Sequence, residues 1–391
     1  MAKHTIAFVN TFAQVSGANI SLLVLLKHLD SSHFKPIVYL PPREARPIYE
    51  DFRIQGIPVE LVPMERPSWK TVSWENFRYV ASLLPTAWKL RKRFRNQEIE
   101  LVVLNGIWNL QGALAALSLR VPIVWWIREE HFPGWVIRIL AKIIEVMAEQ
   151  TVAISESLRE RFYGQKEIKR LNVIYNGVEC VEGHRFTPVS REELGLRAGD
   201  RVIGCVGPLY PPKGQIHLIR AAARIVSQRH RVVLLLVGGE LERQLGYSQQ
   251  VRQEIQAFGL EKHVRLLGFR KDIPALLEHV DIYVQPSISE GFGRAVVEAM
   301  WDGCPVVASA VGGLREIVVQ GETGLLVPPA DSQALARALL TLLDDGEVCR
   351  RMGAAGKQRV LDLFDIRKIS QQAARVLLHA LGRGHIVNPD D

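Results

Sequence analysis

The chain has 391 residues, of which 48% are hydrophobic and 23% charged, and its mean hydropathy is +0.05. This composition excludes a collagen, a mucin or a disordered chain and is typical of a globular protein long enough for two domains. No apolar run reaches the ~18 residues that a membrane-spanning helix needs. The apolar run at residues 6–9 is also too short for a signal-peptide core, so we expect a cytoplasmic protein.

The formal net charge of +8 is concentrated in the first half of the chain. Residues 1–178 contain 23 Lys and Arg against 16 Asp and Glu, whereas residues 179–391 contain 26 against 25. The densest basic cluster lies close to Trp69, Trp74 and Trp88 and consists of Lys89, Arg91, Lys92, Arg93 and Arg95. Such a cluster is typical either of a contact with an anionic membrane or of a solvated helix face. No nucleic-acid-binding motif accompanies it, so we expect no nucleic-acid partner.

Four cysteines are spread over the second half of the chain: Cys180, Cys205, Cys304 and Cys349. Their spacing gives neither a CxxC ligand pair nor a dense disulfide framework. We therefore expect free thiols.

Short apolar runs alternate with helical patterns along the whole chain, which is typical of parallel sheets covered by helices. The first series of expected strands covers residues 5–9, 35–40, 101–104, 123–127, 151–154 and 172–175. The second covers residues 202–206, 232–237, 264–267, 282–284, 306–308 and 324–327. Residues 176–200 lie between them, contain Gly and Pro, and show no sustained period. The pattern predicts an α/β protein with two doubly wound, Rossmann-like domains facing a cleft, with ligands at the carboxyl ends of the strands.

The most informative segment is Pro286–Met300, which reads PSISEGFGRAVVEAM. An expected strand ends just before it, and a helical pattern begins near Gly293. The unpaired N–H groups at a helix start suit a phosphate. Glu290 and Glu298 flank that start and are separated by about 12 Å of helical rise, so one carboxylate could bind a sugar and the other a ribose.

This segment resembles glycosyltransferase family 4, whose members are retaining enzymes of the GT-B fold. Glu290 and Glu298 match the family's E-x7-E pair. Further matches, in the family's order, are Asn176-Gly177-Val178, Lys213-Gly214, Gly238-Gly239, Gly268-Phe269, Gly312-Gly313 and residues 323–328. The resemblance covers nearly all of residues 150–365 and is weaker before them.

The resemblance implies a role for several residues. Glu290 would contact the donor sugar, Glu298 the ribose and Lys213 the diphosphate, while the backbone near Phe269 would contact the base. Gly291, Phe292, Gly293 and Arg294 form the helix start that would hold phosphates. A fixed ammonium stabilises the charge that gathers on a departing diphosphate, so Lys213 is an expected catalytic residue. Glu290, as the contact to the transferred sugar, is the other. No resident cofactor is implied, and the donor would be a UDP-, GDP- or ADP-sugar.

The family pattern is altered at three places. Pro208 stands where many members have an arginine, so a phosphate cation is missing. Arg294 could either compensate for it or be an exposed arginine on the helix surface. Residues 15–19 look like a degenerate form of the family's amino-terminal Gly-Gly-Ala-Glu loop, in which Gly17 is kept. Gly17 could let the backbone approach a phosphate, or the loop could be a plain helix entry. The histidine expected after residues 123–127 is displaced to His131 or replaced by Arg128. Glu129 or Glu130 could serve as the acceptor's base, so Arg128, Glu129 and His131 are candidate acceptor or sugar contacts.

Other catalytic patterns are absent from the sequence. It contains no D-x-D, HExxH, Cys/His cluster or G-x-S-x-G, and residues 207–214 depart from a Walker A loop, so we expect neither a metal nor a P-loop. We expect a transferase whose residues 1–178 bind a sugar or lipid-linked acceptor and whose residues 179–365 bind a nucleotide sugar. Residues 366–384 would form a helix that packs back on the first domain, followed by a tail at 385–391. A nucleotide-sugar epimerase and a non-catalytic partner of the same fold are the alternatives.

Overall fold

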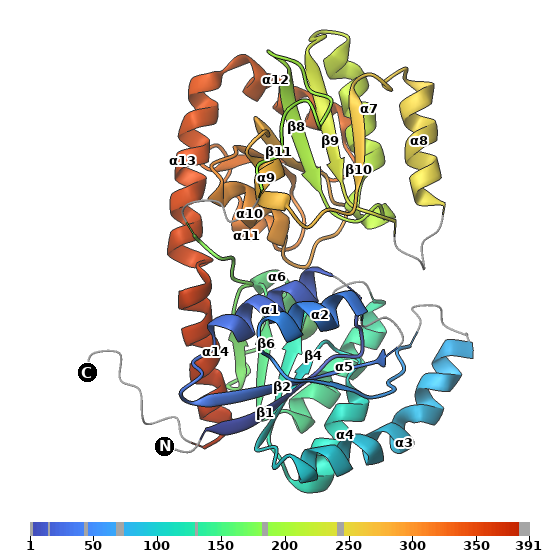
Figure 1. Cartoon of the computed structure of the whole chain (residues 1–391), viewed down its shortest axis with the longest axis vertical. Helices are drawn as coiled ribbons and strands as arrows, with labels where there is room; N and C mark the ends of the chain where they lie inside the picture. The colour runs from blue at the N-terminus through green and yellow to red at the C-terminus, as the bar shows by residue number, and fades with distance from the viewer. Residues whose placement is uncertain are drawn as a thin grey trace. The chain divides into compact units, whose positions relative to one another are not determined.

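The computed structural model describes residues 3–14, 16–42, 46–67, 74–129, 132–181, 187–240 and 246–382. The chain divides into two compact units (Figure 1). Unit 1 comprises Met1–Glu179 together with Ile366–Asp391, and unit 2 comprises Cys180–Asp365. The division predicted from the sequence lies one residue before this boundary. The tail expected at residues 385–391 lies outside the described residues.

Unit 1 is built on a parallel sheet of seven strands in the order β3-β2-β1-β4-β5-β6-β7. The strands are β1 (His4–Val9), β2 (Phe34–Leu40), β3 (Val59–Leu61), β4 (Leu101–Asn105), β5 (Ile123–Ile127), β6 (Gln150–Ala153) and β7 (Leu171–Val173). Six of them confirm the expected strands to within two residues. The short β3 was missed because its sequence, VEL, has too few apolar residues to stand out as a strand.

Helices cover both faces of this sheet. They are α1 (Gly17–His28), α2 (Arg46–Ile54), α3 (Trp74–Asn96), α4 (Leu110–Leu119), α5 (Gly134–Met147), α6 (Glu156–Tyr163) and α14 (Ile366–Ala380). Right-handed crossovers place α1 and α2 on one face and α3, α4 and α5 on the other. The long α3 packs along α4, and α14 packs against α1 and β5 (Figure 1).

The start of α14 is fixed by the motif Asn176-Gly177-Val178. The N–H of Ile366 donates to the carbonyl of Val178 at 3.0 Å. A Cβ at Gly177 would lie 2.8 Å from the Cα of Ile366, so only glycine permits this approach. The last helix therefore belongs to unit 1, although unit 2 separates the two segments in the sequence.

Unit 2 contains a parallel sheet of six strands in the order β10-β9-β8-β11-β12-β13. The strands are β8 (Arg201–Val206), β9 (Val232–Val237), β10 (Val264–Gly268), β11 (Ile282–Gln285), β12 (Val306–Ser309) and β13 (Gly324–Val327). All six confirm the expected ones. The helices are α7 (Gln215–Val226), α8 (Tyr247–Ala257), α9 (Ile273–Leu277), α10 (Arg294–Trp301), α11 (Leu314–Ile317), α12 (Ser332–Asp344) and α13 (Gly346–Leu363).

The strands of unit 2 are apolar on both faces because each face is covered by helices. Along β9, Val232, Leu234 and Leu236 belong to one core cluster. The alternate residues Val233, Leu235 and Val237 belong to a second cluster. The side chains of a strand point alternately to opposite faces, so the two clusters lie on opposite sides of the sheet. This rigid layer fixes the loops that follow the carboxyl ends of its strands.

None of the four cysteines forms a disulfide, and all but Cys180 are buried. Burial raises the pKa of the Cys205 and Cys304 thiols to about 12. None of the described helices combines the length and the apolar character needed to cross a bilayer.

Candidate functional site

The two predicted catalytic residues meet at the carboxyl edge of the unit 2 sheet. Lys213 ends a 3-10 turn, Pro211–Lys213, in the loop after β8, and Glu290 lies in the loop after β11. Lys213 Nζ donates to Glu290 Oε2 at 2.6 Å, although the two residues are 77 positions apart. Both side chains are mostly buried, with 22% of the lysine and 13% of the glutamate exposed. The pair is therefore shielded from water but still accessible to a ligand.

Close backbone contacts hold these two loops together. The N–H of Ile288 donates to the carbonyl of Pro212 at 2.8 Å. Gly214 has a φ of +70°, and a Cβ there would lie 2.0 Å from the carbonyl oxygen of Pro286. The glycine after Lys213 is thus required by both backbone conformation and space. It allows the lysine loop to approach the glutamate loop.

A chain of buried hydrogen bonds supports Glu290 from within the sheet. The Tyr283 hydroxyl donates to Gln285 Oε1 at 2.9 Å, Gln285 Nε2 donates to Ser287 Oγ at 2.8 Å, and Ser287 Oγ donates to Glu290 Oε2 at 3.2 Å. Burial raises the pKa of Tyr283 well above its usual range, so its hydroxyl keeps its proton. This relay could not be predicted from the sequence, because alternate polar residues at a strand end give no catalytic signature.

Both donors to Glu290 use the same carboxylate oxygen, Oε2. As far as the described residues go, this leaves Oε1 available to accept a hydroxyl from a ligand. The direction of the carboxylate is fixed before any ligand binds. Such preorganisation is what a sugar-binding carboxylate needs.

The second predicted glutamate is paired within its own helix. Arg294 Nε donates to Glu298 Oε1 at 2.8 Å, one turn along α10. The Arg294 side chain is only 16% exposed, and among the described residues its buried Nη1 has no hydrogen-bond partner. Arg294 is therefore not a solvated surface arginine. It adds a cation to the amino end of α10, where anions are favoured.

The glycine loop before α10 is pressed against the turn after β12. A Cβ at Gly313 would lie 2.6 Å from the Cα of Phe292 and 2.9 Å from the carbonyl oxygen of Gly291. The N–H of Gly313 also donates to the carbonyl of Glu290 at 3.1 Å. This contact explains why the Gly312-Gly313 motif accompanies the glutamate motif.

The side chain of Phe292 is buried and packs inside unit 2. It is 3% exposed, and its ring meets that of Phe364 edge-on at 5.7 Å. Only the Phe292 backbone can face a ligand, as is also true of Gly291 and Gly293 on either side of it. The three residues shape the loop, and their side chains supply no polar group.

The position predicted for base recognition lies after β10. The ring of Phe269 is 56% exposed, and its Cβ would lie 3.6 Å from a Cβ placed at Gly239, in the loop after β9.

Pro208, which stands where many family members have arginine, has no cationic side chain to offer a phosphate. Its carbonyl accepts a hydrogen bond from Gln215 Nε2 at 2.9 Å.

In unit 1, Gly17 is the first residue of α1 and lies in open space. The loop before it is closed by Asn19, which is 2% exposed. Asn19 Nδ2 donates to the carbonyls of Phe12 and Gln14 at 2.9 and 2.8 Å. Asn19, which departs from the family motif, therefore has a structural role in holding this loop.

Arg128 follows β5 and is buried at the carboxyl edge of the unit 1 sheet, with 8% of the residue exposed. Its Nε donates to Asn105 Oδ1, and its Nη1 donates to Asn176 Oδ1 at 2.7 Å. Its guanidinium lies over the ring of Trp126, 5.3 Å from the centroid. Three strand ends thus hold one buried cation, a role for Asn105 and Asn176 that the sequence analysis did not find.

Glu129 is held by the loop after β4. Its Oε2 accepts from the N–H of Ile107 at 3.1 Å, and Gly106, with a φ of +118°, leaves the space that this carboxylate fills. Glu129 therefore has a structural contact beside its predicted role. The other two candidates for this region, Glu130 and His131, lie outside the described residues.

The basic cluster predicted as one surface does not form a single face. All five residues belong to α3, but Arg93 is turned toward β3, where it pairs with Glu60. Lys89, Lys92 and Arg95 are exposed, and Arg91 is half-buried. Trp69, which we associated with this cluster, lies outside the described residues.

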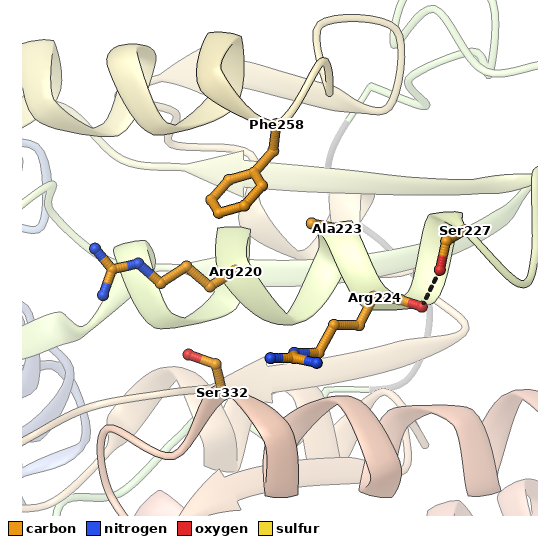
Figure 2. A pocket seen from close by; sticks show the side chains of 6 residues that line it. All are labelled: Arg220, Ala223, Arg224, Ser227, Phe258 and Ser332. Carbon is orange, nitrogen blue, oxygen red and sulfur yellow. Dashed lines mark hydrogen bonds between the residues drawn. The ribbon is translucent and has the colours of Figure 1, made fainter.

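An open pocket of about 440 Å³ lies elsewhere on unit 2 (Figure 2). It is formed by α7, the end of α8 and the start of α12, and its lining consists of Arg220, Ala223, Arg224, Ser227, Phe258 and Ser332. None of these residues was predicted for the donor site. Arg220 is engaged by Glu254 at 2.5 Å, and Ser227 Oγ donates to the carbonyl of Arg224 at 2.9 Å. The pocket is therefore separate from the Lys213–Glu290 site.

Within the described part of the chain, no three His, Cys, Asp or Glu side chains are grouped so that they could hold a metal ion. The charged groups at the unit 2 site are Lys213, Glu290, Arg294 and Glu298. Two cations and two carboxylates at one sheet edge can bind a diphosphate and the hydroxyls of two sugars.

Comparison with known proteins places this geometry in a family. Residues 186–359 match the family model "Glycosyl transferases group 1", and residues 15–182 match "Glycosyltransferase Family 4". The alpha-maltose-1-phosphate synthase of Mycolicibacterium smegmatis is 30% identical over 310 residues, which are 72% of this chain and 79% of that protein. The chain belongs to glycosyltransferase family 4 and has the GT-B fold, as the sequence resemblance predicted.

Two further proteins bear on function. The D-inositol 3-phosphate glycosyltransferase of Corynebacterium glutamicum (strain R) is 38% identical over 172 residues, which cover 43% of this chain and 41% of that protein. The chain spans about half the length of the first curated relatives it matches. The crystal structure of Anabaena Alr3699/HepE in complex with UDP and glucose is similar over 95% of this chain and 98% of that one, with a TM-score of 0.82 and 29% identity.

Proposed function

We propose that the protein transfers a sugar from a UDP-sugar to a hydroxyl of a phosphate-bearing, lipid-linked acceptor, with retention of configuration and without a metal ion. The Lys213–Glu290 pair, held at 2.6 Å by loops from two strands, carries this proposal. It brings a cation suited to a diphosphate next to a carboxylate suited to a sugar hydroxyl. The comparison protein HepE, crystallised with UDP and glucose, supports uracil as the base of the donor.

The residues of unit 2 would divide the donor between them. Lys213 and the amino end of α10, with Arg294, bind the diphosphate and stabilise its charge as the bond to the sugar breaks. Glu290 accepts a hydroxyl of the transferred sugar, and Glu298 accepts the ribose hydroxyls. The departing phosphate takes the proton of the attacking hydroxyl, so a side chain of unit 2 need not act as the base.

Unit 1 would bind the acceptor. Its share of the chain carries most of the net positive charge, and Arg128 is a fixed cation at the carboxyl edge of its sheet. A buried guanidinium held by two asparagines suits a phosphate or carboxylate on the acceptor. The names of two relatives contain a phosphorylated compound, D-inositol 3-phosphate in one and alpha-maltose-1-phosphate in the other, which supports an acceptor that carries a phosphate.

A thermal-shift panel of UDP, GDP, ADP and their glucose conjugates tests the donor. A ligand at 100 times its dissociation constant stabilises the folded state by about 2.7 kcal/mol, so UDP and UDP-glucose should raise the melting temperature by several degrees. A response to GDP or ADP alone would replace uridine in the proposal. No response to any nucleotide would favour the non-catalytic partner.

An incubation without acceptor separates transfer from epimerisation. The enzyme and a UDP-sugar alone should leave the anomeric and ring configuration of the sugar unchanged. Steady conversion of UDP-glucose without acceptor into the UDP-derivative of a different hexose, or into a different free hexose, would indicate the epimerase instead.

A further inference from the structure

The long helix α3 exposes an apolar stripe that the proposed transfer reaction does not use. The stripe consists of Trp74, Phe77, Val80, Leu84 and Trp88, each between 62% and 74% exposed. Their spacing places them on one side of the helix, opposite the buried Tyr79, Leu90 and Phe94 that face the unit 1 core. From Trp74 to Trp88 the stripe extends about 21 Å along the helix axis.

An exposed stripe of this size indicates a binding surface, because monomeric soluble proteins rarely expose large contiguous apolar patches to water. At the amino end of the stripe, the rings of Trp74 and Phe77 stack at 5.2 Å. They therefore cover part of each other but remain mostly exposed. Isolated surface apolar residues need no such explanation.

The same side of α3 becomes basic beyond the stripe. Lys92 and Arg95 follow Trp88 by one and two turns and are exposed, with Lys89 beside them. Over its 23 residues α3 contains six Lys and Arg against a single acidic residue, Glu75. A helix with an apolar side, tryptophans at both ends of that side and an excess of basic residues is suited to lie in the plane of an anionic lipid surface.

Helix α5 adds a second contact of the same kind. It exposes Trp135, Ile139 and Val146, together with Arg138 and Lys142. Its beginning is linked to α3 through aromatic rings, because Trp108 contacts Tyr79 of α3 at 6.2 Å and Phe132 at 5.1 Å. Both helices begin at the carboxyl edge of the unit 1 sheet, so Trp74, Phe77 and Trp135 lie near the same edge as Arg128.

We propose that the stripe of α3, with the start of α5, binds the surface of an anionic phospholipid bilayer. The aromatic rings would lie at the level of the headgroups, and Lys89, Lys92 and Arg95 would contact lipid phosphates. This inference goes beyond the proposed transfer reaction. It rests on the proposed function in one respect: a lipid-linked acceptor would then reach the carboxyl edge of the unit 1 sheet from the membrane.

Sedimentation of the full chain with vesicles tests the proposal. The protein should pellet with phosphatidylcholine vesicles that contain phosphatidylglycerol and remain in solution with phosphatidylcholine alone. Raising the salt from about 0.1 to 1 M should release it, since the screening length falls from about 10 to 3 Å. F77S/L84S should lower the partition coefficient more than tenfold, because it removes two apolar contacts. The matched control I54S/L363S changes two exposed apolar residues elsewhere and should bind normally.

A second pair of variants tests the charge. K89Q/K92Q/R95Q should lose about fivefold in partition coefficient per residue, whereas K166Q/K169Q, also exposed in unit 1, should lose much less. Quenching of tryptophan fluorescence by brominated acyl chains should be reduced in W74F/W88F and unchanged in W301F. Melting temperatures and the response to UDP, both independent of lipid, show whether each variant is folded and whether the donor site is intact.

Three results would overturn the proposal. Normal vesicle binding by F77S/L84S would remove the stripe from the contact. Absence of binding to anionic vesicles by the wild type, with a normal response to UDP, would refute the lipid surface while leaving the donor site standing. Concentration-dependent dimers that F77S/L84S abolishes, without vesicle binding, would identify the stripe as a protein interface.

Discussion

Lys213 Nζ lies 2.6 Å from Glu290 Oε2, and this ion pair joins the loop after β8 to the loop after β11. The lysine therefore already has an anionic neighbour in the absence of donor. In the proposed function, a diphosphate would lie beside this ammonium, and the already oriented Glu290 would accept a sugar hydroxyl with its other oxygen, Oε1. The two residues would then bind adjacent parts of one donor.

The two glutamates should fail in different ways. Glu298→Gln should weaken the binding of both UDP and UDP-glucose by about tenfold or more, the scale of a hydrogen bond to a charged group. Glu290→Gln should leave the affinity for UDP nearly unchanged and lower the rate of transfer. Calorimetry with the two ligands measures the difference.

Glu261→Gln is the control for this comparison, since Glu261 is an exposed residue outside the site. It should behave as the wild type with both ligands. Equal losses of UDP affinity in the two site variants would contradict the assignment of Glu290 to the sugar and Glu298 to the ribose.

Transfer should not depend on a metal ion. Activity should survive excess EDTA, while Lys213→Ala should lower the rate by about 10²-fold or more, the cost of removing a preorganised donor to a developing charge. Lys262→Ala, which changes an exposed lysine before β10, should have little effect. An absolute requirement for manganese or magnesium would show that a metal ion, and not Lys213, stabilises the leaving group.

Gly214 should tolerate alanine much less well than Gly259. Both have a positive φ, +70° and +63°, so alanine costs each about 1–2 kcal/mol of backbone strain. Only at Gly214 does the new Cβ meet a backbone atom, the Pro286 oxygen at 2.0 Å, whereas Gly259 faces open space. Gly214→Ala should therefore separate the lysine and glutamate loops.

Urea unfolding and the transfer assay together measure this prediction. Gly214→Ala should lose more stability than Gly259→Ala and should also lose transfer, while Gly259→Ala keeps it. Equal losses of stability with full activity in both would mean that the contact with Pro286 does not position Lys213.

The strands could be predicted from the sequence, but the hydrogen-bond network that supports the site could not. Buried parallel strands are continuous apolar runs, so 12 of the 13 could be located, and only β3, with its charged centre, was missed. The motif glycines could also be located, and the structure explains Gly214 and Gly313 by close backbone contacts. Loops that follow parallel strands must meet at one edge, which is why Lys213 and Glu290, 77 positions apart, could be assigned to one site, although their direct contact was not predicted.

The polar network around the site could not be predicted in this way. Ser287, Asn105 and Asn176 are ordinary residues whose partners are decided by three-dimensional proximity. The apolar stripe of α3 could be predicted only in part. The sequence placed Trp74 and Trp88 beside the basic cluster, but Phe77, Val80 and Leu84 look like core residues in a sequence. Only their exposure in the folded chain distinguishes these three.

The relay behind Glu290 leads to a last prediction, on stability and catalysis together. Ser287 is fully buried, and its hydroxyl accepts from Gln285 Nε2 and donates to Glu290. Ser287→Ala leaves the amide of Gln285 without its acceptor, which should lower the free energy of unfolding by about 1–3 kcal/mol. It also leaves Lys213 as the remaining donor that orients the Glu290 carboxylate, so the turnover rate should fall more than the affinity for UDP.

A double-mutant cycle separates the relay from simple packing. Gln285→Leu removes the donor that Ser287→Ala would orphan, and Tyr283 can still donate to the carbonyl of Val206 at 3.3 Å. The double variant should therefore lose less stability than the sum of the two single variants, by about 0.5–3 kcal/mol of coupling. Turnover should stay low in both variants that lack Ser287, because neither restores the hydroxyl that donates to Glu290 beside Lys213. Additive losses of stability, or normal turnover in Ser287→Ala, would show that the buried hydrogen bonds do not hold the catalytic carboxylate.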